Sequence, residues 1–248
     1  MSFFLLVSFS SIIFATNCLG AVIGAGSTVI AIPLCIMLLG IETAKPVLTM
    51  YGLLLNIYLC AVSWRDIDFP ALRRILVIMG LGLPLGIAAY DFLPKTLLQQ
   101  VLSVFILIVA VRGLILARWP DFNMGNPGEL LLNAILFSSG VIQGAFATGG
   151  PLLISYAAEK LKAKNPFRAT QAIVWVFTNG IMTAQMGYAG HLADEVWKVA
   201  AYGMPVLIAG GILGNRLHYR MDQKVFTVLT YCLLCATGII MAYDSFRN

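Results

Sequence analysis

Charged residues are absent from eight long stretches of this chain, and these stretches predict its helices. The charge-free stretches are residues 1–41, 46–64, 75–90, 96–111, 130–158, 169–193, 199–215 and 225–243. A helix that crosses a bilayer needs about 20 apolar residues, so residues 1–41 and 130–158 are too long for one crossing. Both contain clustered glycines followed by a proline, and such residues interrupt helices. The pattern therefore predicts helices near residues 2–22, 27–41, 45–63, 72–90, 95–117, 128–146, 150–161, 166–188, 195–213 and 221–243, of which the second and seventh are short.

The two glycine-rich interruptions predict a place where a ligand meets the backbone. At membrane depth, irregular backbone persists only where it is buried in protein or lines a polar cavity. The helix after each interruption would present unpaired N–H groups at the positive end of its dipole, which favours anions. The candidate residues are Gly24, Gly26, Ser27 and Thr28 at the first interruption and Thr148, Gly149 and Gly150 at the second. The alternative is that the glycines only allow close helix packing.

Matching residues at constant spacing predict that the chain is a tandem duplication. A shift of 123 residues relates Gly26 to Gly149, Lys45 to Arg168 and Asn56 to Asn179. A shift of 128 relates Gly82 and Gly86 to Gly210 and Gly214. We expect a first transmembrane repeat over residues 1–118, a linker over 119–127 and a second repeat over 128–248, within a single membrane domain.

The composition places this chain in a membrane. Of its 248 residues, 60% are hydrophobic and 11% are charged, and the mean hydropathy is +0.89. A soluble domain of this size could not cover so much apolar surface, so we expect an all-α integral membrane protein in contact with the lipid bilayer. The net charge of +5 is scattered over helix connections, which argues against nucleic acid as a partner. The five cysteines lie in apolar stretches, and we expect no metal, redox site or cofactor.

The distribution of Lys and Arg predicts the orientation of the helices. If the chain turns back at each interruption, twelve of its sixteen Lys and Arg residues fall on the side of the connections after helices three, five, seven and nine. The positive-inside rule then places both termini on the periplasmic side of a bacterial inner membrane. Because each half has an odd number of helices, the second half is expected to be inverted. Inverted repeats with broken helices are typical of secondary transporters, whose substrate site lies where the repeats meet.

Some polar side chains are predicted at membrane depth. Asn56 and Asn179 lie in the middle of equivalent helices, where their amides could bind an anion or could join helices. Lesser candidates are Gln143, Thr170, Gln171, Thr178 and Gln185, of which we retain Gln171 for the site. Lys45 and Arg168 begin helices near the interface, and we expect them to be snorkelling anchors. The alternative is a vestibule that attracts anions.

The chain has no visible catalytic or proton-relay constellation. Asp, Glu and His are missing from the middle of every predicted helix, and His191 and His218 are expected in loops. A Ser–His pair, paired aspartates or an HExxH helix at membrane depth is not found, so we predict that the protein is not an enzyme. An anion that leaves a cell with a negative interior gains about 2.3 kcal/mol per charge per 100 mV, so export could run without a proton relay.

The glycine motifs resemble those of the TauE/SafE family of sulfite and organosulfonate exporters. The resemblance rests on Gly20, Gly24-Ala25-Gly26-Ser27 and Pro33-Leu34 in the first repeat, and on Gly140, Gly144, Gly149-Gly150-Pro151 and Phe167-Arg168-Ala169-Thr170 in the second. It covers nearly the whole chain and implies a transporter that exports small sulfur-containing anions, such as sulfite, sulfoacetate or thiosulfate, by alternating access of its repeats. The family usually has consecutive glycines where this chain has Gly26-Ser27-Thr28, so the resemblance does not fix the anion. The alternatives are an anion channel and a non-transporting membrane assembly subunit.

Overall fold

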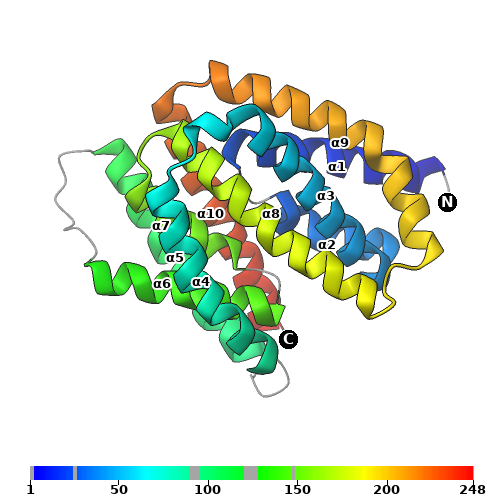
Figure 1. Ribbon diagram of the computed structural model, residues 1–248, viewed down its shortest axis with the longest axis horizontal. Helices are drawn as coiled ribbons and strands as arrows, with labels where there is room; N and C mark the ends of the chain where they lie inside the picture. Colours follow the sequence, from blue (N-terminus) through cyan, green and yellow to red (C-terminus); the bar gives the residue numbers. More distant parts are fainter. Residues whose placement is uncertain (1–2, 25–26, 90–94, 120–127, 147–148, 248) are drawn as a thin grey trace. The chain divides into compact units, whose positions relative to one another are not determined.

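The computed structural model describes residues 3–24, 27–89, 95–119, 128–146 and 149–247. Within these ranges the regular structure is helical, which confirms the predicted all-α fold class (Figure 1). The helices are α1 (Phe3–Ile23), α2 (Ser27–Leu39), α3 (Ile41–Ser63), a 3₁₀ helix η1 (Trp64–Asp66), α4 (Phe69–Ala89), α5 (Lys95–Arg118), α6 (Glu129–Phe146), α7 (Gly150–Lys160), α8 (Lys164–Tyr188), α9 (Asp194–Arg220) and α10 (Gln223–Arg247). Each predicted helix has its counterpart among them.

The largest error in the predicted boundaries concerns the end of α9. We expected this helix to end near residue 213, but it continues to Arg220. The expected place of His218 in a loop is therefore wrong, because this residue lies in the last turn of α9 and is fully buried. The charge-free stretch stops before Arg216, yet positive residues do not end a helix. In its last turn they stabilise the negative end of its dipole.

The two helices that follow the glycine-rich interruptions are short, as the sequence predicts. α2 has 13 residues and α7 has 11. At a rise of 1.5 Å per residue these helices are about 20 and 17 Å long, whereas the hydrocarbon core of a bilayer is about 30 Å thick. Neither helix is long enough to cross a membrane alone.

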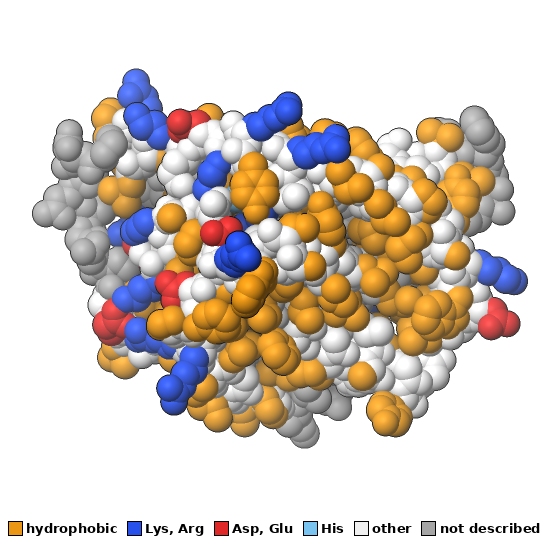
Figure 2. Space-filling model, turned by 45° about the horizontal axis from the view of Figure 1, so that its top comes forward, with side chains coloured by type: hydrophobic (Ala, Val, Ile, Leu, Met, Phe, Trp, Pro, Cys, Tyr) orange, Lys and Arg blue, Asp and Glu red, His pale blue; other side chains and the backbone are white. Residues whose placement is uncertain are grey.

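Among the described residues, five helical segments are long and apolar enough to cross a membrane. They are Leu5–Ile23, Glu42–Asp66, Phe69–Gly86, Asp194–Arg220 and Gln223–Ile240. Many of their apolar side chains remain exposed on the protein. Along one face of α4, for example, Val77, Leu81 and Leu85 recur every four residues and are more than half exposed. Apolar side chains cover much of the face in Figure 2, as a surface in contact with lipid requires.

The helices form two compact units, and each unit takes helices from both halves of the sequence. Unit 1 comprises residues Met1–Asp68 and Asn165–Met221, which hold α1–α3, α8 and α9. Unit 2 comprises Phe69–Lys164 and Asp222–Asn248, which hold α4–α7 and α10. In unit 1, α1 lies along α9 (Figure 1), and the core contains Phe9, Ile13, Tyr51, Leu55 and Leu207. In unit 2, α4 packs on α6 and α5 packs on α10.

A glycine allows close helix contact at the same position in each unit. In unit 1, a Cβ on Gly210 of α9 would lie 2.9 Å from the carbonyl oxygen of Phe14 and 3.4 Å from the nitrogen of Cys18 in α1. In unit 2, a Cβ on Gly82 of α4 would lie 2.4 Å from the carbonyl oxygen of Phe137 and 2.9 Å from the nitrogen of Val141 in α6. The glycines differ by 128 positions and their contacts by 123, which are the two shifts that relate the sequence halves.

A methyl group at Gly82 should therefore destabilise the protein. We expect Gly82→Ala to lower the free energy of unfolding by about 1–3 kcal/mol, because two helix backbones must move apart. Gly80 is the matched control, since it lies in the same helix and a Cβ there would meet nothing within 4 Å. Gly80→Ala should be neutral or stabilising by up to about 1 kcal/mol, because alanine favours helix. Thermal unfolding of the purified variants in detergent checks this, and equal effects at both positions would contradict it.

A candidate anion-binding site

The first interruption separates α1 from α2 in unit 1. Gly24 follows the last residue of α1, and its φ of 84° lies in the left-handed region that favours glycine. Its N–H group donates to the carbonyl oxygen of Gly20 at 2.7 Å. Ser27 begins α2, so Gly24 and Ser27 are the described residues next to the first interruption. Gly26, which we also predicted for the site, lies outside the described residues.

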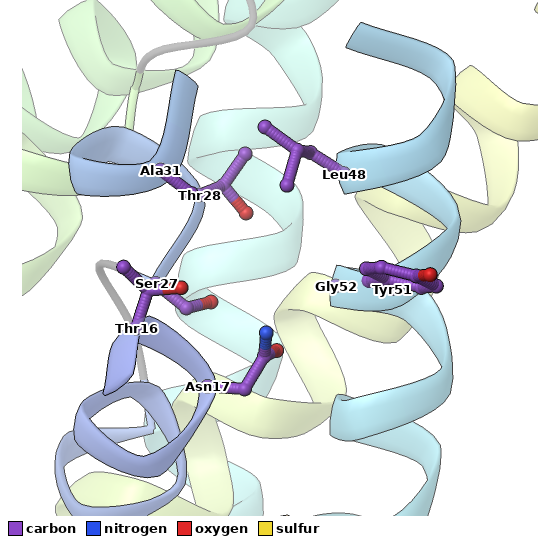
Figure 3. Close-up of a pocket in the computed structure, with 8 residues that line it drawn as sticks. All are labelled: Thr16, Asn17, Ser27, Thr28, Ala31, Leu48, Tyr51 and Gly52. Atoms are coloured by element: carbon purple, nitrogen blue, oxygen red, sulfur yellow. The ribbon is translucent and has the colours of Figure 1, made fainter. Parts of the chain in front are cut away.

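A narrow polar recess lies between this pair of helices and α3. Its lining residues are Thr16, Asn17, Ser27, Thr28, Ala31, Leu48, Tyr51 and Gly52. Figure 3 shows the side chains of Asn17 and Thr28 directed from α1 and α2 toward α3. The recess holds about 170 Å³ of space between atoms, which includes space open to the surroundings, but it is too narrow to admit a water-sized sphere.

Four of the predicted site residues lie together in unit 1, around Gly52 of α3. The side-chain nitrogen of Asn179 lies 2.9 Å from the position of a Cβ on Gly52, and Thr28 Oγ1 lies 3.4 Å from the same point. Ser27 lines the recess beside them. The amide nitrogen of Asn56 donates to the carbonyl oxygen of Gly52 at 2.7 Å, within its own helix. That donor is thus used by the backbone in this conformation.

The structure places Arg168 inside unit 1 and not at the interface. Its side chain is fully buried, so the prediction of a snorkelling anchor is wrong. The Nη1 atom donates to Asn215 Oδ1 at 2.8 Å and to the carbonyl oxygen of Ala21 at 3.3 Å. The guanidinium carbon lies 4.9 Å from the centre of the Tyr219 ring, an arrangement that favours cation–π attraction. α8 begins at Lys164, so Arg168 lies in its second turn, on the face turned toward α1 and α9.

The remaining nitrogens of Arg168 have no hydrogen-bond partner among the described residues. These atoms are Nε and Nη2. No carboxylate in this part of the chain forms an ion pair with the guanidinium, and Asp66 acts on it only at longer range. A buried cation without a counter-ion is costly in a medium of low dielectric constant. The site therefore attracts a negatively charged group.

Gln171 adds a second unpartnered polar group one turn along α8. Its side chain is fully buried, and neither its Nε2 nor its Oε1 has a hydrogen-bond partner among the described residues. Trp175 Nε1 is likewise buried and unpartnered. Residues 168, 171, 175 and 179 are three or four positions apart, so they follow one face of the helix. Leaving a polar group buried and unpaired costs about 1–3 kcal/mol, which makes this face suited to a polar ligand.

His218 joins three helix ends close to this site. Its Nδ1 lies 2.7 Å from the carbonyl oxygen of Val22 at the end of α1. Its Nε2 lies 3.0 Å from Oδ1 of Asn165 at the start of α8. Because His218 belongs to the last turn of α9, the imidazole fixes the positions of α1, α8 and α9 relative to one another.

The second interruption, in unit 2, has a different chemistry. The N–H group of Gly149 donates to Gln143 Oε1 at 2.9 Å, and Ser139 Oγ donates to the carbonyl oxygen of Gly149 at 2.8 Å. Gly150 is buried and begins α7, and Thr148 lies outside the described residues. The expected open N–H group at Gly149 is thus occupied in this conformation. The lesser candidate Gln143 of α6 supplies the acceptor.

Sequence reasoning undervalued Arg168 and Asn215. The charge of Arg168 at a helix start suggested a snorkelling anchor near the interface, and Asn215 was not singled out. One signal was available: Arg168, Gln171, Trp175 and Asn179 have the spacing of a single helical face, and three of them are polar or charged. A polar face on an apolar helix must be buried against protein in a membrane. Nothing in the sequence indicates that Asn215 would be the partner of Arg168.

The contact between Gly24 and Arg168 can be tested with a methyl group. A Cβ on Gly24 would lie 2.8 Å from Arg168 Cγ and 2.9 Å from its Cα and carbonyl oxygen. We expect Gly24→Ala to cost about 1–2 kcal/mol for the left-handed backbone and about 1–3 kcal/mol more for the clash. Gly40 is the control, because its φ is 75° and a Cβ there meets nothing within 4 Å. Thermal unfolding should show the larger loss for Gly24→Ala, and equal losses would exclude the close contact.

Comparison with known proteins gives two findings. A model of the sulfite exporter TauE/SafE family matches residues 9–241, which extend from α1 into α10. Among curated proteins, the chain is 25% identical over 195 residues to the protein named "Probable inner membrane transporter protein TsaS" of Comamonas testosteroni. That alignment covers 75% of this chain and 77% of the relative. No solved structure matches the chain.

Proposed function

Because the chain belongs to the sulfite exporter TauE/SafE family, we propose that this multi-pass membrane transporter moves a small sulfur-containing oxyanion out of the cell. The substrate class comprises sulfite, sulfoacetate, related organosulfonates and thiosulfate. The name of the relative, an inner membrane transporter, supports a bacterial inner membrane as the location.

The observation that carries this proposal is the buried guanidinium of Arg168. Two of its three nitrogens have no hydrogen-bond partner among the residues that the structure describes, and the same holds for the side-chain amide of Gln171 on the same helical face. A site with one fixed positive charge favours a small anion over a neutral or cationic solute, since the low dielectric constant strengthens the attraction. Export of such an anion is favoured by a negative cell interior.

The transport cycle that we propose is alternating access of two inverted repeats. The excess of Lys and Arg on one side supports inverted halves. The equivalent glycine contacts at Gly82 and Gly210 support two copies of one packing arrangement. The recess beside Thr28 is too narrow for a water-sized sphere, so a solute could bind there only after the surrounding helices move. The substrate-binding residues that we propose are Gly24, Gly26, Ser27, Thr28, Asn56, Thr148, Gly149, Gly150, Gln171 and Asn179.

Flux measurements on the purified protein in liposomes test the proposed function. We expect saturable uptake of radiolabelled sulfite, sulfoacetate or thiosulfate, stimulated several-fold by the same unlabelled anion inside, because a carrier exchanges substrates faster than it returns empty. Uptake that does not saturate and is not stimulated would favour the alternative of an anion channel. Absence of flux for all three anions, with a stable partner on purification, would favour the assembly subunit.

The proposed orientation has its own test. With both termini outside, alkaline phosphatase fused after Asn248 should be active in intact bacteria, because this enzyme matures only in an oxidising compartment. The same fusion after Arg118, in the predicted cytoplasmic connection, should be inactive. An active enzyme only at the second position would reverse the orientation.

A further inference from the structure

We infer that Arg168 and Gln171 form the substrate contact, and that they select a monoanion carrying two coplanar oxygens beside a hydrogen-bond donor. This inference rests on the proposed function in one respect, namely that the transported solute is an oxyanion. It goes further in naming the atoms that bind the solute and the class of oxyanion that they accept.

Among the described residues, the hydrogen bonds of Arg168 use only one of its three guanidinium nitrogens. Nη1 is held by Asn215 and by the carbonyl oxygen of Ala21, whereas Nε and Nη2 have no hydrogen-bond partner within the described part of the chain. In a planar guanidinium, the N–H bonds of Nε and Nη2 lie parallel along one edge, which matches two oxygens of a carboxylate, sulfonate or phosphate. The structural contacts thus use one corner of the group and leave its bidentate edge available.

Neighbouring side chains hold the guanidinium edge formed by Nε and Nη2 of Arg168 in a fixed position. Asn215 accepts from Arg168 and donates its own amide nitrogen to the hydroxyl oxygen of Tyr58 at 3.3 Å. The Tyr219 ring lies against the guanidinium, and Gly24 allows the backbone of α1 to approach it. An edge fixed in this way loses little entropy when it binds a ligand, which favours affinity.

The side-chain amide of Gln171 requires a ligand that also carries a hydrogen-bond donor. Gln171 has both an unpartnered donor, Nε2, and an unpartnered acceptor, Oε1. An oxyanion alone can satisfy only the donor. A ligand with a hydroxyl, amine or acidic proton next to its oxyanion can satisfy both atoms. One guanidinium balances one negative charge, so the preferred form is a monoanion, such as hydrogen sulfite or a hydroxylated sulfonate.

The first repeat lacks an arginine and a glutamine at the positions equivalent to Arg168 and Gln171. The positions equivalent to Arg168 and Gln171 in the first repeat are Lys45 and Leu48, at a shift of 123. Lys45 is exposed and Leu48 is a buried apolar residue. The bidentate edge and the amide are therefore properties of α8 alone, and α3 supplies matched positions for controls.

Arg168→Lys tests the bidentate edge, because lysine keeps the positive charge but lacks the paired Nε and Nη2 donors. We expect the dissociation constant for ethanesulfonate, measured by calorimetry or thermal shift on the purified protein, to rise at least tenfold. Lys45→Gln, which removes an exposed charge at the equivalent position, should leave it within twofold. An unchanged affinity for ethanesulfonate in a folded Arg168→Lys protein would overturn the proposed role of the bidentate edge. If the unmodified protein binds no oxyanion, including acetate, both this inference and the proposed function fail.

Gln171→Leu supplies the second test and does not remove any observed hydrogen bond. The unmodified protein should prefer 2-hydroxyethanesulfonate over ethanesulfonate at least tenfold, since only the former satisfies both Gln171 atoms. In Gln171→Leu this preference should vanish, while the affinity for ethanesulfonate is kept and the melting temperature without ligand rises. A lowered melting temperature or a preserved preference would show that Gln171 has a structural role and would overturn its assignment. Binding of acetate but of neither sulfonate would instead overturn the proposed sulfur substrate. It would still support bidentate binding of an oxyanion by Arg168.

Discussion

Burial of a guanidinium without a carboxylate partner is the constraint on which the structure of unit 1 depends. Arg168 is tolerated inside because Asn215, the carbonyl oxygen of Ala21 and the Tyr219 ring surround part of it. Those groups come from α1 and α9, so the charge on α8 joins three helices of unit 1. Its remaining nitrogens, without hydrogen-bond partners among the described residues, carry a desolvation cost that an anion bound there, as we propose, would offset.

The distribution of charged residues along the chain predicted the helices well, but it predicted poorly which polar side chains are buried. The absence of charges over residues 1–41 and 130–158 was enough to predict that each stretch holds two helices. The charge pattern ended the ninth predicted helix before Arg216, which put His218 in a loop, and it put Arg168 near the interface as a snorkelling anchor. In a membrane protein the energetic question is whether a polar group finds a partner, and Asn215, Val22 and Asn165 are partners that only the fold reveals.

The two halves share an equivalent glycine contact but differ in the chemistry of their interruptions. The glycine contacts at Gly82 and Gly210 occur at equivalent positions, since any side chain there would separate two helix backbones. Gly24 and Gly149 at the interruptions are equally crowded, but by different neighbours. In the first half Gly24 accommodates the backbone of Arg168, while in the second half Gln143 and Ser139 bind Gly149 directly. Sequence comparison of the halves could find the glycines but could not find these different partners.

The hydrogen bond from Gly149 to Gln143 has a consequence for the stoichiometry of transport. A glutamine oxygen on a backbone N–H group takes the place that a solute oxygen would take, and being tethered nearby it competes at a high effective concentration. Under the proposed function, a solute at the second interruption would have to displace Gln143, whereas Nε and Nη2 of Arg168 have no such competitor among the described residues. A cycle in which a monoanion binds at Arg168 would move one elementary charge per turnover, so we expect net transport to be electrogenic.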